Sequence, residues 1–370
     1  MQKILHICQS DIGGTTEYIY LLIKNLDKSK YENILVCPSS GNIKRKISEL
    51  GIKIYILEMI REISFIKEFK DILEIRKIIK KENPDILFLH SSKAGALGRI
   101  AGIGIRNLKV LYNSHGWSFT MDCSERKKKI YALIERILSF FTHRIINISE
   151  DEYKKAIERK IPKEKMIIIE NGIDIKKYKE NSKIKFLNKF VIGIVGRISE
   201  QKNPMFLIKI CEELIRRKEK DFIFYVVGDG ELKDKFEKEI KDKKLEEYFF
   251  IRGWSDKSEE EIRNFDVALM VSKWEGFGLV VCEYMAALKP VIAINVGGVK
   301  NIIKNEINGV LVNKYSSEKF VDEILRIKID KLLKEKLIKN AYKDVKEKYS
   351  IEKEIKEIEK IIWFESKKGI

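Results

Sequence analysis

Long apolar runs are missing from this sequence of 370 residues. Its apolar stretches are short pieces such as residues 267–271, far below the roughly 18 residues that a membrane-spanning helix needs. Near the N-terminus, the apolar residues 4–8 are fewer than the roughly 7–15 that form the core of a signal peptide. The sequence therefore predicts a cytoplasmic chain.

Cysteine is also scarce, with five residues and no Cys-x-x-Cys pair. An odd number without that spacing argues against a disulfide framework and against a zinc site. Cys8, Cys37, Cys211 and Cys282 fall in apolar strand or helix patterns, so we expect them to be small buried side chains. Disordered and low-complexity classes are excluded, because 44% of the residues are hydrophobic and 35% are charged.

Acidic residues are outnumbered, since 73 Lys and Arg residues stand against 56 Asp and Glu residues, for a net charge of +17. Such a surface can attract nucleic acid, anionic lipid headgroups or phosphorylated substrates. It can equally reflect a Lys-rich composition in which lysines solvate helix faces. The sequence has no zinc-finger spacing, RNP-like aromatic strand or basic recognition helix, so we expect no nucleic-acid partner.

The sequence does have a repeated alternation of short apolar runs and amphipathic segments. A polar stretch at 171–189 interrupts this alternation, which restarts at Phe190–Val195. Several runs are apolar on both faces, as buried parallel strands require. The pattern predicts an α/β chain with two consecutive βαβ sheets, which we place in domains at 1–175 and 176–345.

A separate amphipathic helix is expected in the remaining segment, 346–370. Ile351, Ile355, Ile358 and Ile362 recur there at helical spacing. This apolar face must pack on another element.

Parallel sheets bind ligands beyond the carboxyl ends of their strands, so the residues that follow each strand are the candidates for a site. In the first half these are Gly13 and Gly14, before a helix, and His115, just after the strand at 110–113. Glycine lets the backbone approach a ligand, and a helix N-terminus favours an anion. The alternatives are a tight turn at the glycines and a histidine bonded within its own loop.

In the second half, Gly196-Arg197 ends a strand and Lys202 follows five residues later. Both cations precede a predicted helix, with Asn203 as N-cap and Pro204 as first helical residue. Two cations beside free backbone N–H groups can cradle a diphosphate. The alternative is a pair of solvated surface cations.

Two carboxylates flank a glycine loop at 275–283, the most informative stretch. Glu275 follows a strand, and Glu283 lies on an apolar helix. Burying such a carboxylate unpaired is costly, and sugar or ribose hydroxyls are suitable partners. A salt bridge to a lysine is the alternative for either residue alone. Upstream, Gly228 opens a Gly-Asp-Gly turn that fits either a cleft floor or a β-turn.

In this order and spacing, the motifs resemble those of the retaining GT-B glycosyltransferases of family 4, over essentially the whole chain. The motifs that carry the resemblance are Gly13-Gly14, 114–116, 171–174, Gly196-Arg197 with Lys202, 227–230, Glu275 with Glu283, and Gly297-Gly298. The segments 91–95 and 115–117 look like the branch that builds capsule and exopolysaccharide in bacteria.

The resemblance implies two Rossmann-like domains that face each other across a cleft, with the final helix crossing back to the first domain. The first domain would bind the acceptor, and the second would bind the nucleotide diphosphate sugar. The implied activity is a retaining, metal-independent sugar transfer of the EC 2.4 class, with a UDP-sugar as the expected donor. The expected acceptor is a glycan or a polyprenyl-diphosphate-linked sugar in bacterial surface polysaccharide synthesis.

No metal or other cofactor is expected, and no Asp-x-Asp stands at a strand end to hold a divalent cation on a diphosphate. Two alternatives remain: a nucleotide-sugar 2-epimerase of the same architecture, and a basic nucleic-acid-binding protein.

The resemblance also implies roles for single residues. Arg197 and Lys202 would contact the diphosphate, Glu283 the ribose and Glu275 the sugar hydroxyls, while His115 would reach the donor sugar from the other domain. The further donor-binding residues are Gly13, Gly14, Gly196, Gly228, Phe277, Gly278, Leu279 and, beside the base, Arg252. Ser91 and Lys93 are assigned to the acceptor. The sequence departs from the family pattern at Leu288, where glycine is usual, and at 272–274, where Ser-Lys-Trp replaces the common Pro-Ser.

A basic cluster, Arg126 with Lys127, Lys128 and Lys129, opens a predicted helix over 125–141 with a heavily apolar body. Interfacial helices combine these two features, so we expect peripheral binding to the anionic inner face of the plasma membrane. The alternative is a thick helix buried between the sheet and its neighbours, with the lysines merely solvated.

Overall fold

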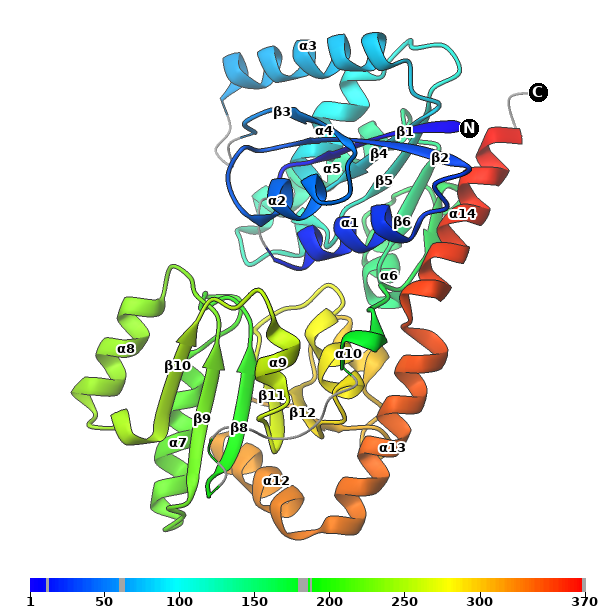
Figure 1. Cartoon of the computed structure of the whole chain (residues 1–370). Coiled ribbons are helices and arrows are strands. Elements are labelled where there is room, and N and C mark those ends of the chain that lie inside the picture. The colour runs from blue at the N-terminus through cyan, green and yellow to red at the C-terminus, as the bar shows by residue number, and fades with distance from the viewer. Residues whose placement is uncertain (11–12, 60–63, 179–185, 187, 368–370) are drawn as a thin grey trace. The chain divides into compact units, whose positions relative to one another are not determined.

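The computed structural model describes residues 1–10, 13–59, 64–178, 186 and 188–367. The chain divides into two compact units (Figure 1). The first unit comprises Met1–Gly172 together with the segment from Ile351, and the second comprises Ile173–Ser350.

In the described residues, the first unit contains a sheet of seven parallel strands in the order β3-β2-β1-β4-β5-β6-β7. The strands are β1 (Gln2–Cys8), β2 (Tyr31–Cys37), β3 (Lys53–Ile56), β4 (Ile86–His90), β5 (Lys109–Asn113), β6 (Arg144–Asn147) and β7 (Met166–Ile168). The central strands are buried on both faces, which explains their continuous apolar sequence.

Helices cover both faces of this sheet (Figure 1). One face carries α3 (Phe65–Glu82), α4 (Ser92–Ala101), α5 (Glu125–Ser139) and α6 (Glu150–Glu158), and the other carries α1 (Gly14–Asn25), α2 (Asn42–Ser48) and α14 (Ile351–Lys367). Short 3-10 turns lie at Ser118–Thr120 and Lys163–Lys165.

The C-terminal helix α14 packs on the first unit, beside α1. Ile351, Ile355, Ile358 and Ile362 all lie in the core cluster shared with α1 and β1, which confirms the predicted apolar face. Glu354 lies on the same helix and is buried, and the backbone N–H of Gly172 donates a hydrogen bond of 2.6 Å to its carboxylate.

The buried position of Glu354 leads to a prediction for the pH dependence of stability. Burial raises the pKa of Glu354 from 4.5 to about 8, so the folded state keeps a proton that the unfolded state loses. The contribution of Glu354 to the free energy of unfolding is therefore fully present below pH 4.5 and is lost as the pH rises towards 8. Glu354→Gln keeps the acceptor but does not titrate. We expect its loss of stability between about pH 5 and pH 8 to be smaller than that of wild type, by on the order of 2 kcal/mol.

Denaturant unfolding of both proteins across this pH range measures the difference. Other titrating groups contribute equally to the two proteins, so the difference isolates Glu354. Identical pH profiles would mean that Glu354 does not hold a proton in the folded state.

In the described residues, the second unit contains six parallel strands in the order β10-β9-β8-β11-β12-β13. The strands are β8 (Phe190–Val195), β9 (Phe222–Val227), β10 (Phe249–Gly253), β11 (Val267–Met270), β12 (Val291–Ile294) and β13 (Val310–Val312). The helices are α7 (Met205–Arg216), α8 (Lys233–Asp242), α9 (Ser258–Ile262), α10 (Leu279–Ala286), α11 (Val299–Ile302), α12 (Ser317–Ile329) and α13 (Lys331–Lys348), with 3-10 turns at Ile175–Tyr178 and Glu246–Tyr248. The predicted pair of consecutive βαβ sheets is confirmed, and both units are Rossmann-like domains.

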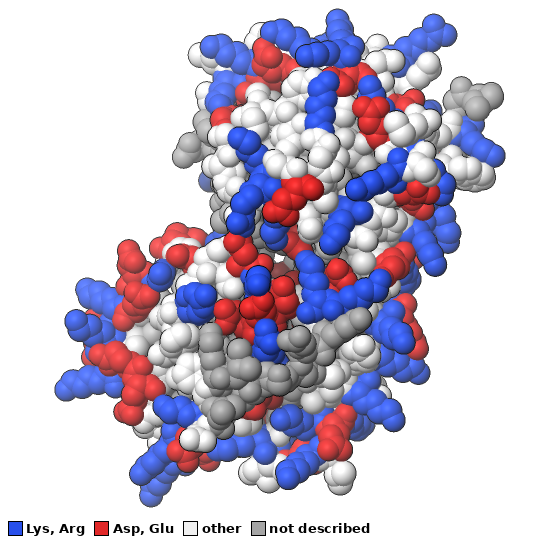
Figure 2. Space-filling model, in the orientation of Figure 1, with Lys and Arg blue, Asp and Glu red and all other residues white. Residues whose placement is uncertain are grey.

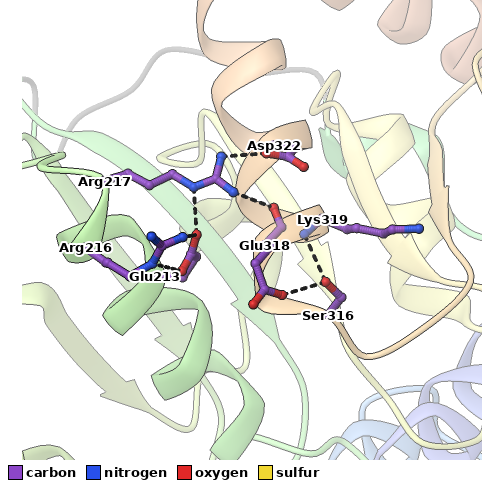
Figure 3. A network of polar contacts seen from close by, with 7 residues as sticks. All are labelled: Glu213, Arg216, Arg217, Ser316, Glu318, Lys319 and Asp322. Atoms are coloured by element: carbon purple, nitrogen blue, oxygen red, sulfur yellow. Dashed lines mark hydrogen bonds and ion pairs between the residues drawn. The ribbon is translucent and has the colours of Figure 1, made fainter.

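A polar network joins the end of α7 to the start of α12 (Figure 3). The buried carboxylate of Glu213 accepts two hydrogen bonds of 2.7 Å from Arg216 and one of 2.7 Å from Arg217. Arg217 also donates to Asp322 and to the backbone carbonyl of Glu318 on α12. The network helps to fix α7, whose first turn follows the loop with the two candidate cations.

The charged residues and the cysteines show no sign of a special site. Figure 2 shows Lys and Arg side chains spread over both units on the visible face and interspersed with Asp and Glu, rather than gathered in one patch. All five cysteines lie in the described part of the chain and none forms a disulfide; Cys8, Cys37, Cys211 and Cys282 are buried.

None of the described helices is long and apolar enough to cross a membrane.

Candidate functional site

The candidate cations of the second unit lie at the point where its strand order reverses. β9 and β11 flank β8 on opposite sides, and such a switch point is where open parallel sheets bind ligands. The loop after β8 carries Arg197 and Lys202, and the loop after β11 carries Glu275. Backbone and side-chain hydrogen bonds join these two loops: Lys273 N–H donates to the Gln201 carbonyl at 2.7 Å, and Gln201 donates to the Trp274 carbonyl at 3.0 Å.

At this edge of the sheet, neighbouring loops approach so closely that two positions have room only for glycine. A Cβ at Gly228, which has φ 148°, would lie 1.9 Å from the Gly196 carbonyl oxygen, and one at Gly297, with φ 48°, would lie 1.8 Å from that of Glu275. Any side chain would push these loops apart, so glycine is required to bring the loops after β8, β9, β11 and β12 together.

Lys202 and Glu275 form an ion pair across the switch point. Glu275 is only 9% exposed, and the Lys202 side chain lies against Gly196. The lysine salt bridge considered as an alternative for Glu275 therefore exists, but it joins two of the predicted site residues. Arg197 is partly buried, and no described residue forms an ion pair or hydrogen bond with its guanidinium.

The expected helix cap at Asn203 is wrong. The helix α7 begins at Met205, Pro204 takes the N-cap position, and no side chain in the described part of the chain caps the helix. Asn203 instead adopts φ 53°, a left-handed conformation that Asn tolerates better than most residues. This conformation turns the chain from the cation loop into the helix.

The glycine loop between the two carboxylates starts α10. Gly278 has φ 97° and precedes Leu279, the first residue of the helix. Phe277 is buried and lies edge-on to Tyr349, which anchors the loop in the unit. Glu283, in the second turn of α10, is partly buried.

The departures from the family pattern leave the local backbone intact. Leu288 adopts φ 56°, so the turn has the left-handed form that glycine adopts without strain. In the segment 272–274, Ser272 is buried and its carbonyl accepts a hydrogen bond of 2.8 Å from Tyr315, while Lys273 pairs with Glu200.

Arg252 has a structural partner. It lies on β10, at the edge of the sheet, and its guanidinium donates to the buried Glu261 at 3.2 Å. Tyr225 also donates to Glu261. The side chain of Arg252 is still 42% exposed, so part of it remains accessible to a ligand.

In the first unit, three loops at the carboxyl edge of the sheet hold predicted site residues in left-handed conformations. They are the loops after β1, β4 and β5, with Gly13 at φ 93°, Ser91 at φ 80° and His115 at φ 53°. For Ser91 and His115 this conformation costs roughly 1–2 kcal/mol each. Gly13 precedes Gly14, the first residue of α1, and no atom of the described residues lies within 4 Å of the position that a Cβ would take on either glycine.

Three residues outside the predicted site contact His115, and a fourth, Glu152, binds the backbone two residues further along the same loop. The backbone N–H of His115 donates to the Asn113 side chain at 3.0 Å, and Tyr18 of α1 packs edge-on against its ring at 4.5 Å. His90 bonds to the ring itself. Glu152 accepts a hydrogen bond of 2.8 Å from the Trp117 N–H, and burial raises its pKa to about 7. Of these residues, His90 could have been noticed in the sequence, because it is a histidine at the end of an otherwise apolar strand.

The predicted acceptor and membrane residues are dispersed over two helices. Lys93, in the first turn of α4, pairs with Glu68 at 2.9 Å. Lys127 and Lys129 are exposed in the first turns of α5, whereas Lys128 pairs with Glu125 at 2.9 Å.

Models of two families divide the chain between them. The model for Glycosyltransferase Family 4 matches residues 12–177, and that for Glycosyl transferases group 1 matches residues 174–344. An uncharacterised 41.2 kDa protein from the cps region of Klebsiella pneumoniae is 32% identical over 86% of this chain and 88% of that protein. The chain belongs to glycosyltransferase family 4.

Other relatives of this glycosyltransferase have named activities. It is 29% identical, over 83% of each chain, to the UDP-Gal:alpha-D-GlcNAc-diphosphoundecaprenol alpha-1,3-galactosyltransferase of Escherichia coli. It is 27% identical to the capsular polysaccharide biosynthesis glycosyltransferase CapM of Staphylococcus aureus, over 94% of this chain and 93% of CapM.

Among solved structures, the glycosyltransferase is similar to Anabaena HepE in complex with UDP and glucose. The TM-score is 0.85 at 19% identity, and the match covers 98% of this chain and 99% of HepE. The likeness confirms the GT-B fold that the resemblance implied.

Proposed function

We propose that the second unit binds a nucleoside diphosphate sugar, with UDP as its nucleotide, at the carboxyl edge around Arg197 and Lys202. The observation that carries the proposal is the pair of cations at the switch point, of which Arg197 has no described anionic partner. An unpaired, partly buried guanidinium is suited to phosphate oxygens. UDP in the HepE complex and UDP-Gal in the name of the E. coli relative support the choice of nucleotide.

The proposed reaction proceeds with retention of configuration and without a metal ion. As the glycosidic bond breaks, negative charge develops on the departing diphosphate, and Arg197 and Lys202 stabilise it. The acceptor hydroxyl attacks from the face that the diphosphate leaves, and a phosphate oxygen takes up its proton. In this scheme Glu275 and Glu283 bind the sugar and ribose hydroxyls.

The proposed acceptor is a glycan or a polyprenyl-diphosphate-linked sugar of a bacterial surface polysaccharide. The E. coli relative named for GlcNAc-diphosphoundecaprenol and the capsule relative CapM support this class. The test incubates the protein with UDP-, GDP- and ADP-sugars, with and without a polyprenyl-diphosphate-linked sugar, and with EDTA in parallel. The proposal requires transfer from a UDP-sugar that persists in EDTA. A product from the donor alone would favour the 2-epimerase, and loss of activity in EDTA with rescue by Mg²⁺ would refute metal independence.

We also propose that α5 binds an anionic membrane surface. Its apolar stripe points outward, with Ile130 54%, Leu133 56% and Ile137 50% exposed. The inward face is made of Ala132, Glu135, Leu138 and Ser139, and Glu135 pairs with the buried Arg99 at 2.7 Å. An inner face with two polar side chains and an apolar stripe exposed on the outside disfavour the alternative of a thick buried helix. Arg126, Lys127 and Lys129 lie exposed at the start of the helix and complement anionic headgroups.

The prediction for this surface is a loss of vesicle binding in the Lys127/Lys128/Lys129→Ser variant. Wild type should co-sediment with anionic vesicles in a salt-sensitive manner, and each lysine removed should weaken binding by about 1 kcal/mol. The matched control is Lys331/Lys336/Lys339→Ser on α13, which removes the same charge from exposed positions of another helix. If both variants lost the same amount of vesicle binding, the loss would come from net charge and not from α5, and the proposal would be refuted. Absence of wild-type binding at low salt would also refute the proposal.

A further inference from the structure

Three of the four histidines of this chain lie together on one face of the first sheet. His6 is on β1, His90 is at the end of β4, and His115 follows β5. His6 and His90 are fully buried on the face that α1 covers, whereas His115 is partly exposed at the carboxyl edge.

A continuous line of hydrogen bonds joins the three rings to Asn33 of β2. Asn33 Oδ1 lies 3.0 Å from His6 Nε2, His6 Nδ1 lies 3.2 Å from His90 Nε2, and His90 Nδ1 lies 3.2 Å from His115 Nε2. The strand register produces this diagonal line: His6 is opposite Phe88, and His90 is opposite both Cys8 and Asn113. The ring of Phe88 stacks against both His6 and His90, at interplanar angles of 28° and 27°.

All three rings are neutral at pH 7, because burial lowers their pKa values, to about 4 for His6 and about 3 for His115. A neutral imidazole has one N–H donor and one lone pair, so each ring can donate on one side only. The amide oxygen of Asn33 can only accept. His6 must therefore donate from Nε2 and accept at Nδ1. Because His6 Nδ1 accepts, His90 must donate from Nε2 and accept at Nδ1. For the same reason His115 must donate from Nε2.

From this line we infer that Asn33, His6 and His90 are positioning residues that fix the tautomer of His115, so that its Nε2 carries the proton and its Nδ1 presents a lone pair. The inference rests on the proposed function and on the role that the resemblance implies for His115, a contact with the donor sugar. A lone pair at Nδ1 accepts a hydrogen bond from a sugar hydroxyl and repels a carboxylate. The line therefore makes His115 selective for a neutral, hydroxyl-bearing sugar over a uronic acid at that contact.

Packing alone does not account for the line. Apolar side chains would fill the same face of β1 and β4 without the desolvation that buried imidazoles require. The line also ends at His115, whose strained backbone is held by the Asn113 side chain. A line of three polar side chains from β2, β1 and β4 thus leads to the His115 ring, while Asn113 holds its backbone at the carboxyl edge.

The test reads the tautomers directly by long-range ¹H–¹⁵N NMR on protein labelled with ¹⁵N-histidine. We expect the Nε2-protonated form at His6, His90 and His115. His143 is the internal reference, because the Val110 N–H donates to its Nδ1 at 3.0 Å and sets the same tautomer independently of the line. An Nδ1-protonated form at any of the three rings of the line would overturn the inference.

Two variants test the transmission of this choice. Asn33→Leu removes the terminal acceptor without touching His115, and we expect mixed tautomers at all three histidines together, with His143 unchanged. His90→Phe keeps the ring shape and removes the acceptor of His115. We expect it to lower kcat/KM for the donor roughly tenfold, the loss of one hydrogen bond, while the affinity for free UDP stays the same. The variant should also lower the ratio of kcat/KM for the neutral sugar donor to kcat/KM for the corresponding uronic acid donor.

The outcomes separate this inference from the proposed function. An unchanged His115 tautomer in Asn33→Leu would refute the line even if the protein transfers sugar normally. Correct tautomers without UDP-sugar turnover would instead refute the proposed function. Loss of UDP affinity in a folded His90→Phe protein would indicate general structural damage rather than positioning, and would count against the inference.

Discussion

Arg197→Ala and Lys202→Ala are each expected to lower kcat/KM for the donor by on the order of 10²–10³, comparable to the loss of one preorganised charge donor. The physical reason is that the leaving diphosphate gains charge in the transition state next to these cations. The effect should fall on kcat at least as much as on KM, because free substrate carries less of that charge. Steady-state kinetics with a UDP-sugar measures both constants.

Lys209→Ala is the matched control. Lys209 is an exposed cation on α7, the helix that follows the loop of Arg197 and Lys202, and it lies outside that loop. Its kcat/KM should stay within about twofold of wild type, as expected for a solvated surface charge. If Arg197→Ala and Lys202→Ala behaved like this control, with folding intact, both residues would be surface cations and the diphosphate assignment would be wrong.

The two glutamates are expected to respond differently to truncation. Glu283→Ala should weaken UDP binding by roughly 10- to 100-fold, because the ribose hydroxyls lose a charged acceptor. Glu275→Ala should reduce kcat more than it reduces UDP affinity, because this carboxylate faces the sugar in the proposed scheme. Calorimetric UDP titrations together with turnover numbers separate the two effects, and unchanged UDP affinity in Glu283→Ala would remove the ribose assignment.

The ion pair between Glu275 and Lys202 adds a coupling to this prediction. Removing Glu275 also frees Lys202, so the double variant should lose less activity than the product of the two single losses. Strict multiplicativity would mean that the two side chains act separately despite their contact.

Much of the architecture could be predicted from local sequence pattern. The strand Phe190–Val195 appears where its apolar run predicted it, because a buried parallel strand must be apolar on both faces. The isoleucines of α14 predicted its packing face for a similar reason. Helix ends were less predictable, as Asn203 shows, because several local conformations satisfy the same backbone groups.

The helix α5 illustrates where periodicity is insufficient. A stripe at helical spacing indicates an amphipathic helix but not the side that faces inward. Tertiary contacts decide this, because Arg99 of α4 and Tyr112 of β5 both bond to Glu135 and hold its side of the helix inward.

The sequence by itself determined the two sheets, the final helix and the set of strand-end residues, since each depends on a short stretch of chain and on the rule that parallel strands present their carboxyl ends together. The tertiary structure decided which side chains meet. The pairing of Lys202 with Glu275 and the line from Asn33 to His115 join residues far apart in sequence. Their contacts follow from strand order and register, which side-chain packing over the whole sheet sets and no local pattern encodes.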